Sequence, residues 1–359
     1  MKMKRLLSWS LVVLLLFVGA CGNREEPSSS ASSEPPAANT GSSETNGAET
    51  GEGDAATEAV EFTFAHIFDT NHPLHVRAQE AADALERESG GRYKIRIVPG
   101  GSLGDMETNH QGLSLGTIDI TIVGGAYLGR SYEPLLIGSA PYVFRDNGHV
   151  RKYFESDLFK EFIDEYESIT GNVILNSVYT GARHVTSNKP IHKPEDMKGL
   201  KIRVPDAELF LAMPNAVGAK PTPIAFGEVY LALQNGTVDA QENPLVTIDN
   251  MKFYEVQKYI NLTAHINEPA HTVMSPKAWE KIRPEDREMV LRIFGEAALN
   301  VMNDIDKNEE EILAKFEAAG NIVNRDVDIP AFIAAVEPFN TSPERPWTAE
   351  HYRRLQEIR

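Results

Sequence analysis

The segment Arg183–Pro244 carries the most information about this chain. It contains R-H-V-T-S-N-K-P from Arg183, D-M-K-G-L-K-I-R-V-P from Asp196, and F-G-E-V-Y-L-A-L-Q-N-G-T-V-D-A-Q-E-N-P from Phe226. Arg183 and Arg203 stand among residues that are typical of a protein core. A buried guanidinium group needs an anionic partner. No acid nearby in the sequence is an obvious match for either arginine, so we expect a ligand to supply the anion.

Arg203 lies on a short predicted strand, on the face opposite its apolar neighbours, and Pro205 ends that strand. Open α/β sheets bind their ligands at the carboxyl ends of parallel strands. Arg183 follows the end of another predicted strand, and an arginine fork can hold a carboxylate through two parallel hydrogen bonds. The alternative is a surface strand with an exposed polar face, as we expect for Arg96.

The second candidate feature is the polar cluster Gln241-Glu242-Asn243. Pro244 biases Asn243 away from helical backbone angles, which restricts where its amide points. An ordinary polar turn is the alternative interpretation. Phe226 begins a stripe of apolar residues at helical spacing, for which core packing is the default. Because Phe226 lies at the start of that helix, it could instead form the wall of a pocket.

Two short sequence echoes suggest an internal repeat. K-I-R-I at 94–97 is similar to K-I-R-V at 201–204, and L-G-T-I-D at 115–119 is similar to Q-N-G-T-V-D at 234–239. Each half then has the order strand, helix, glycine, strand, which predicts βαβ units and parallel strands. Two such lobes would face each other across a cleft, where ligands commonly bind. The alternative is that G-T-[IV]-D is a common helix-to-strand joint that recurs by chance.

The helices of the two echoes are predicted at 104–115 and 226–234. Gly116 and Gly236 stand where a left-handed residue ends a helix. The remaining patterns predict further helices at 147–166, 276–306 and 307–319 and a strand at 171–179.

The N-terminus has the pattern of an export signal. Three of the first five residues are basic, and Leu6–Ala20 is mostly apolar but short for a membrane span. The sequence Val18-Gly19-Ala20-Cys21 resembles a bacterial lipobox. We expect residues 1–20 to be a signal peptide and Cys21, the only cysteine, to be lipidated. An ordinary secretory signal with an incidental cysteine is the alternative.

Residues 21–60 are predicted to be a disordered linker. They are mostly Ser, Glu, Ala, Thr, Gly and Pro, and they offer too little apolar surface to offset the cost of ordering the chain. The first 20 residues carry three positive charges, and residues 22–61 carry one positive and nine negative charges. Of the chain's net charge of −17, residues 62–359 therefore hold −12. This acidic balance argues against nucleic acid as a partner.

No catalytic or cofactor motif is found in the sequence. Gly100–Gly104 lacks the glycine spacing of a dinucleotide site, and there is no P-loop, H-E-x-x-H or G-x-S-x-G. His72 and His75 have a spacing that helical metal ligands can use, but no third ligand stands out. We therefore expect no enzymatic activity, no cofactor and no metal site.

From about Phe62 to the final helices, the chain closely resembles the DctP-type solute-binding proteins of tripartite ATP-independent periplasmic (TRAP) transporters. Three stretches carry the resemblance: D-M-K-G-L-K-I-R, the block from Phe226 to Pro244, and F-Y-E-V-Q-K-Y at 253–259. The resemblance implies a type II periplasmic-binding-protein-like α/β fold with two lobes, mixed sheets and a long hinge helix. It implies lobe I at 61–180 plus 269–308 and lobe II at 181–268 plus 309–359.

The resemblance also implies roles for individual residues. Arg203 would clamp the ligand carboxylate, and Arg183 would be the second arginine of the cleft. Asn243 would contact the ligand with its amide, and Gln241 would be a further ligand-binding residue. Phe226 would form the aromatic wall. The first lobe would contribute its part of the site through the residues His66 and Gly124.

Gly124 is a departure from the family pattern, because sialate-binding members carry Glu where this chain has Gly, and this argues against sialic acid as the ligand. The run P-Y-V-F-R-D at 141–146 is similar to that of members that bind sugar acids. A uronate, aldonate or keto-sugar acid is therefore the expected ligand, and C4-dicarboxylates remain open. The implied partners are TRAP membrane subunits, with a sensory protein acting on a membrane kinase as the alternative. The protein is expected to be a monomer, anchored by lipid at the outer face of the cytoplasmic membrane.

Overall fold

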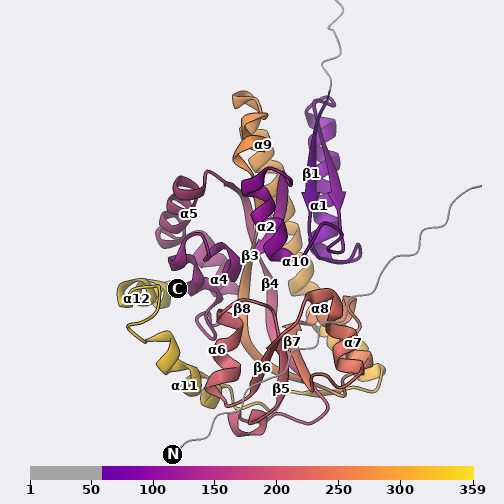
Figure 1. Cartoon of the computed structure of the whole chain (residues 1–359), viewed down its shortest axis with the longest axis vertical. Helices are drawn as coiled ribbons and strands as arrows, with labels where there is room; N and C mark the ends of the chain where they lie inside the picture. Colours follow the sequence, from indigo (N-terminus) through magenta and orange to yellow (C-terminus); the bar gives the residue numbers. More distant parts are fainter. Residues whose placement is uncertain (1–58) are drawn as a thin grey trace, which may run out of the picture. The chain divides into compact units, whose positions relative to one another are not determined.

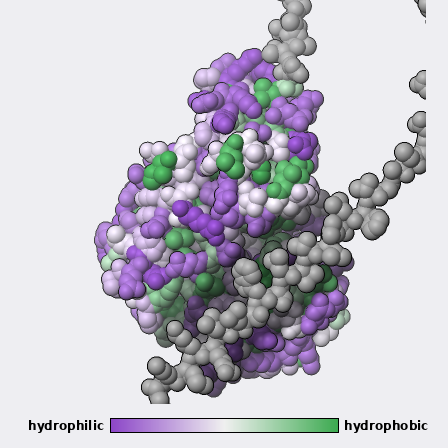
Figure 2. All heavy atoms as spheres, viewed as in Figure 1, coloured by the Kyte–Doolittle hydropathy of each residue, from purple (hydrophilic) through white to green (hydrophobic). Residues whose placement is uncertain are grey.

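The computed structural model describes residues 59–359. The predictions for residues 1–20, for Cys21 and for nearly all of the linker lie outside the described residues. No helix in residues 59–359 is long and apolar enough to cross a membrane. Hydrophilic residues cover most of the described part of the face in Figure 2, and apolar residues appear there in small separate groups.

A mixed sheet of nine strands organises the described residues (Figure 1). Its order is β2-β1-β3-β8-β4-β7-β5-β6, and β9 pairs with β8. The predicted α/β fold with mixed strands is therefore confirmed. The strands are β1 (Val60–Ala65), β2 (Tyr93–Val98), β3 (Ile120–Gly124), β4 (Val173–Ser187), β5 (Lys201–Val204), β6 (Lys220–Pro223), β7 (Ala240–Pro244), β8 (Tyr259–Met274) and β9 (Ile322–Asn324).

Helices cover both halves of this sheet (Figure 1). They are α1 (Pro73–Glu88), α2 (Met106–Leu115), α3 (Gly125–Leu128), α4 (Asn147–Phe154), α5 (Asp157–Thr170), α6 (Leu209–Ala216), α7 (Val229–Gln234), α8 (Leu245–Asn250), α9 (Pro276–Glu280), α10 (Arg287–Ala318), α11 (Ile329–Asn340) and α12 (Ala349–Glu357). Short 3₁₀ helices are η1 (Glu133–Ser139), η2 (Pro194–Met197), η3 (Phe226–Glu228), η4 (Phe253–Glu255) and η5 (Pro284–Asp286). The charged helix predicted at 307–319 is the second half of the 32-residue helix α10.

The two halves of the sheet repeat one βαβαβ unit. β1 lies between β2 and β3 and is parallel to both, and β5 lies in the same way between β6 and β7. The Asp119 carboxylate accepts a hydrogen bond from the Thr63 amide at 2.8 Å. The Asp239 carboxylate accepts one from the Lys201 amide at 3.2 Å. These equivalent contacts make β5 the counterpart of β1.

The repeat corrects one of the two sequence echoes. The G-T-[IV]-D echo is structural, because both copies lead into the third strand of their unit. The match of K-I-R-I with K-I-R-V is wrong, because the first lies on the edge strand β2 and the second on the inner strand β5. Ala65 is thus the positional equivalent of Arg203. Arg96 is exposed and pairs with Glu61 at the surface, as expected for a polar strand face.

The strands β4 and β8 connect the two units. They are 15 and 16 residues long and run antiparallel to each other, with β3 on one side and β7 on the other. Their pairing is irregular between Tyr179 and Ala182 and between Arg183 and Val185. The strand predicted at 171–179 is therefore only the first half of β4.

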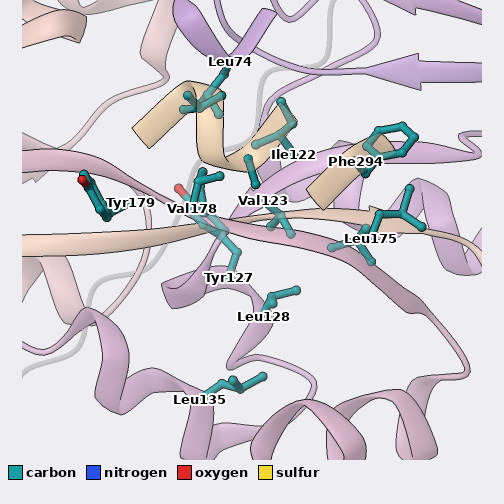
Figure 3. Packing of buried hydrophobic residues seen from close by; sticks show 14 of the residues in the cluster. Leu74, Ile122, Val123, Tyr127, Leu128, Leu135, Leu175, Val178, Tyr179 and Phe294 are labelled. Atoms are coloured by element: carbon teal, nitrogen blue, oxygen red, sulfur yellow. The ribbon is translucent and has the colours of Figure 1, made fainter. Parts of the chain in front are cut away.

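Apolar side chains from helices and strands pack against each other on the larger half of the sheet. Leu74 of α1, Ile122 of β3, Leu175 of β4 and Phe294 of α10 meet there (Figure 3). Burial of side chains of this size contributes about 1.5–3 kcal/mol each. Two smaller clusters fill the other half. One contains Ile202, Met213 and Phe332, and the other contains Val229, Ile248 and Phe316.

The lobe boundaries given in the sequence analysis stay a prediction. That prediction assigns residues 309–359, which include the C-terminal helix α12, to lobe II. The rings of His351 in α12 and Phe162 in α5 lie 5.0 Å apart, and Arg354 pairs with Glu161 at 2.8 Å. α12 therefore packs against a helix that the same prediction places in lobe I.

Substitution of Gly236 tests the left-handed backbone conformation predicted at the end of its helix. The φ of Gly236 is +69°, and an added Cβ would meet no atom within 4 Å, so a side chain there costs backbone strain alone. We expect Gly236→Ala to lower the free energy of unfolding by about 1 kcal/mol. Gly295→Ala, in open space inside α10, should raise it by about 0.5–1 kcal/mol. Urea unfolding measures both, and equal effects would contradict the assigned backbone geometry.

Candidate functional site

A cavity of about 790 Å³, counting the open space at its mouth, lies where the two βαβαβ units meet β4 and β8. Gly124, at the end of β3, and Arg203, near the end of β5, both line it. Asn243 of β7, Arg183 of β4 and Glu268 of β8 also face it. The cavity therefore collects the carboxyl ends of parallel strands from both units, where α/β sheets bind ligands.

Arg203 is buried and forms no ion pair with another residue in the part of the chain that the structure describes. It is 2% exposed, and its Nε and Nη2 both donate hydrogen bonds to the Ile224 carbonyl, at 2.9 and 2.7 Å. Its Nη1 is buried and has no hydrogen-bond partner among residues 59–359. Burial lowers the pKa of Arg203 to about 10, so the group is still charged at neutral pH. Such a charge favours the arrival of an anion.

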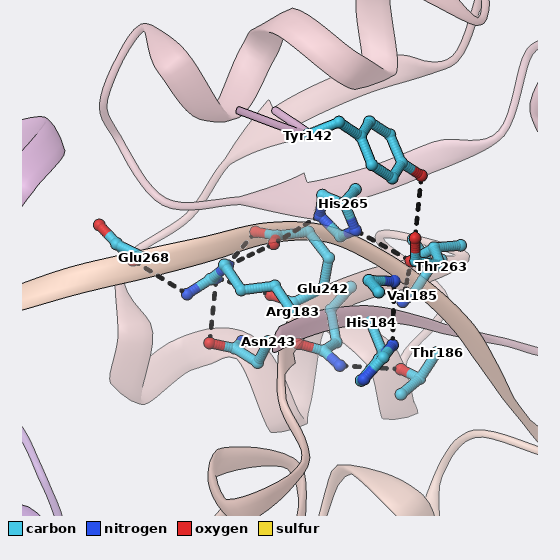
Figure 4. A network of polar contacts seen from close by, with 12 residues as sticks. Tyr142, Arg183, His184, Val185, Thr186, Glu242, Asn243, Thr263, His265 and Glu268 are labelled. Atoms are coloured by element: carbon cyan, nitrogen blue, oxygen red, sulfur yellow. Dashed lines mark hydrogen bonds and ion pairs between the residues drawn. The ribbon is translucent and has the colours of Figure 1, made fainter. Parts of the chain in front are cut away.

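Arg183 has its anion within the protein. Its Nε lies 2.5 Å from Glu242 Oε2, and its Nη2 lies 2.9 Å from Glu242 Oε1 (Figure 4). Nη2 also donates to Asn243 Oδ1 at 3.1 Å, and Nη1 lies 3.3 Å from Glu268 Oε2. The expectation that both arginines lack an acid is therefore wrong for Arg183. Its guanidinium stacks over the Phe210 ring at 4.8 Å.

Strand register explains why the partner of Arg183 was missed. β4 and β7 are antiparallel, and Arg183 lies opposite Pro244. Glu242 is then its diagonal neighbour on the same face, within reach of a long side chain. The two residues are 59 positions apart in the sequence, so only the pairing of the strands brings them together. His265 Nε2 lies 3.1 Å from the same Glu242 carboxylate.

Asn243 and Gln241 act as a connected pair. The Asn243 amide donates to Gln241 Oε1 at 2.6 Å, and Gln241 Nε2 donates to Thr186 Oγ1 at 3.0 Å. Asn243 lines the cavity, whereas Gln241 is fully buried behind it and is in register with Arg203 on β5. Gln241 therefore fixes the Asn243 amide and does not itself reach the cavity.

Of the three remaining predicted residues, two line the cavity and one does not. Phe226 lines the cavity, and its ring meets Phe253 edge-on at 6.5 Å. Gly124 also lines it. His66 is fully buried and is not among the lining residues. Its Nε2 lies 3.1 Å from His75 Nδ1, and burial with the nearby His75 lowers its pKa to about 4.

Several lining residues were not predicted. Sequence reasoning missed Glu268, which comes from the middle of a long strand without a distinctive pattern, and Tyr127, which follows Gly124 by one turn of chain. It also missed Phe68, Met106, Phe210 and Thr247. Within residues 59–359, no three His, Cys, Asp or Glu side chains are placed to hold a metal ion.

A cavity between two α/β units, with a buried guanidinium nitrogen that no residue of 59–359 accepts from, is typical of a protein that binds a small molecule with an anionic group. The comparison with known families agrees. The model for bacterial extracellular solute-binding protein, family 7 (DctP), matches residues 64–342, and the chain belongs to this family.

The chain is also similar to individual proteins whose ligands are named. The sialic acid-binding periplasmic protein SiaP of Vibrio cholerae is 37% identical over 265 residues, which cover 73% of this chain and 81% of that protein. A TRAP periplasmic solute-binding protein of Actinobacillus succinogenes with bound L-galactonate has a TM-score of 0.78 and 32% identity, covering 83% of this chain and 99% of that one. One from Sulfurospirillum deleyianum with bound succinate has a TM-score of 0.77 and 26% identity, with the same coverage.

The ion pair of Glu242 gives a prediction about stability. Burial raises the pKa of Glu242, but Arg183 and His265 outweigh it and bring the value down to about 2. A lowered carboxyl pKa stabilises the fold above the ordinary pKa, and this stabilisation is lost as the pH falls toward 2. We expect Glu242→Gln to lower the free energy of unfolding by about 3 kcal/mol at pH 7. The loss should shrink between about pH 5 and pH 2.

Urea unfolding over this pH range measures the effect. Glu310→Gln, an exposed carboxyl on α10, serves as the matched control and should change stability by less than about 0.5 kcal/mol. A loss for Glu242→Gln that is as large at pH 3 as at pH 7 would contradict the assignment.

Proposed function

We propose that this protein is an extracytoplasmic receptor that captures a small organic acid and delivers it to TRAP membrane subunits. The observation that carries the proposal is Nη1 of Arg203, which lies at the cavity and has no hydrogen-bond partner among residues 59–359. A ligand carboxylate would supply the missing acceptor and the missing charge in a site shielded from water, where charge-assisted hydrogen bonds are strong. The protein would bind the acid without altering it.

The proposed site uses the cavity residues in different ways. Arg203 holds the carboxylate, and Arg183, already fixed by Glu242, adds positive charge beside it. The Asn243 amide faces the ligand from β7, and the Phe226 ring forms an apolar wall. In this scheme His66 and Gln241 act from behind the wall, by supporting the residues in front of them.

A sugar acid is the proposed ligand. Two of the related proteins bind sialic acid and L-galactonate, and both ligands combine one carboxylate with several hydroxyl groups. A uronate, an aldonate or a keto-sugar acid has the same combination. The alternative is a C4-dicarboxylate, which the succinate-bound relative favours.

Capture would be coupled to closure of the two units over the ligand. β4 and β8 are the strands that connect them, and two residues on these strands have positive φ: Gly181 at +91° and Ala264 at +45°. A ligand that contacts both units favours the closed state by the difference in its affinity for the two states. The membrane subunits could then distinguish the loaded receptor from the empty one.

A thermal-shift screen tests the proposed function. The compounds are N-acetylneuraminate, L-galactonate, D-glucuronate, 2,3-diketo-L-gulonate and succinate. A ligand raises the unfolding temperature progressively once its concentration exceeds its dissociation constant. We expect at least one sugar acid to give such a shift at a lower concentration than succinate. A protein that responds to none of these acids would contradict the proposal.

Replacement of Arg203 tests the carboxylate site. We expect Arg203→Ala to weaken binding of the acid selected by the screen by about 2–5 kcal/mol, because the ligand loses its buried ionic partner. Isothermal titration calorimetry measures the change. Arg96→Ala removes an exposed arginine from the edge strand β2 and should leave the affinity unchanged. Equal affinities for the wild type and Arg203→Ala would refute the assignment.

Lipid anchoring is the second part of the proposal. The small residues before the sole cysteine support cleavage at Cys21 and its lipidation. We expect Cys21→Ala to release the protein from membranes, because the attached acyl chains would be lost. Fractionation of expressing cells, followed by immunoblotting, measures the distribution. A variant that stays in the membrane fraction would count against the anchor.

A further inference from the structure

Glu268 is a buried carboxyl on the cavity wall that has no assigned role. The residue is 7% exposed and lines the same cavity as Arg203. Its Oε2 lies 3.3 Å from Arg183 Nη1, a long contact (Figure 4). Its Oε1 is buried and has no hydrogen-bond partner among residues 59–359. A buried acceptor without a partner is costly, and a ligand group can remove that cost.

Gly124 makes room for this carboxyl. β3 and β8 are antiparallel, with Gly124 opposite Ala270, so that Glu268 is the diagonal neighbour of Gly124. A Cβ added to Gly124 would lie 2.5 Å from Glu268 Oε1. No side chain can therefore stand at position 124 while the carboxyl keeps its place. The glycine and the carboxyl form one arrangement on the cavity wall.

The neighbouring Arg183 compensates the charge of Glu268 only in part, through one ion pair of 3.3 Å. Arg183 already holds Glu242 through two short contacts, so one guanidinium serves two buried carboxyls. Burial raises the pKa of Glu268 to about 7. The charge of Arg183 opposes this rise, and that of Glu242 adds to it. The titratable groups that face Glu268 among the described residues are Arg183 on β4, Glu242 on β7 and Tyr127 on α3.

We propose that Glu268 reads the part of the ligand beyond its carboxylate: it accepts hydrogen bonds from hydroxyl groups and rejects a second carboxylate. The inference rests on the proposed function, in which Arg203 holds one carboxylate. A hydroxyl group donates to Glu268 Oε1 and satisfies it. A second carboxylate has no proton to donate and adds a third negative charge around the single guanidinium of Arg183. The chemical class selected is a polyhydroxy monocarboxylic acid.

The isosteric variant Glu268→Gln tests this inference. Calorimetry at pH 8 compares L-galactonate and D-glucuronate with succinate, for the wild type and the variant. We expect the wild type to bind at least one of the two sugar acids more tightly than succinate. The variant should lose about tenfold or more in affinity for that sugar acid and should bind succinate more tightly than the wild type does.

The pH dependence separates selection from a merely structural effect. Between pH 8 and pH 6.5, the wild type should gain several-fold in succinate affinity, because protonation of Glu268 removes the repulsion. Glu268→Gln should show no such gain. Glu309→Gln is the matched control, because Glu309 is a half-buried carboxyl on α10 whose pKa burial also raises, and it is not among the lining residues.

Each outcome has a distinct meaning. If Glu268→Gln binds the sugar acid within about twofold of the wild type and keeps the same preference over succinate, the role of Glu268 is refuted and the proposed function stands. If the wild type prefers succinate, the selection against a second carboxylate is refuted and a dicarboxylate receptor remains. If the wild type binds none of these acids, the proposed function fails, and this inference fails with it.

Glu268→Asp provides a second variant in case the amide disturbs Arg183. It keeps the charge but withdraws it by one methylene group from Gly124. We expect it to weaken binding of the sugar acid and to keep the rejection of succinate at pH 8. Retention of full affinity for the sugar acid would refute the proposed contact.

Discussion

The ion pair between Arg183 and Glu242 is the interaction on which the rest of the site depends. It joins β4, one of the two strands that connect the βαβαβ units, to β7 of the second unit. Both groups are almost completely buried, and breaking such a pair leaves an uncompensated charge in the interior. His265 and Asn243 are held to the same two side chains. The cavity wall on this side is therefore fixed before any ligand arrives.

This pair also decides which arginine remains available. Because Glu242 is bound to Arg183, Arg203 donates only to the Ile224 carbonyl within the described part of the chain, and that neutral acceptor cannot offset its charge. Among the described residues, the site thus contains one arginine with an ion-pair partner, Arg183, and one without, Arg203. The positive charge of Arg183 nearby adds to the effect of burial in lowering the pKa of Arg203. A carboxylate bound at Arg203 relieves both effects.

The sequence was sufficient for the class of fold and for part of the repeat. Glycines at helix ends and the G-T-[IV]-D joints are local signals, and they mark the same place in both units because local geometry dictates them. The K-I-R echo failed because a strand's sequence does not record its neighbours. Lys94–Ile97 and Lys201–Val204 have nearly the same pattern, yet one segment lies at the edge of the sheet and the other lies inside it. Strand order is a long-range property.

The same limit governs what could be predicted of the site. Arg203 and Phe226 stand beside local markers, a strand-ending proline and a helix start, so their place at the cavity followed from the sequence and the family resemblance. Glu268 has no such marker. At Gly124, the family pattern predicts against sialic acid because the Glu of sialate-binding members is missing, whereas the glycine leaves room for the carboxyl of Glu268 from β8. A departure at one position of a family pattern therefore does not exclude the corresponding chemistry, because an adjacent strand can supply the same group to the same space.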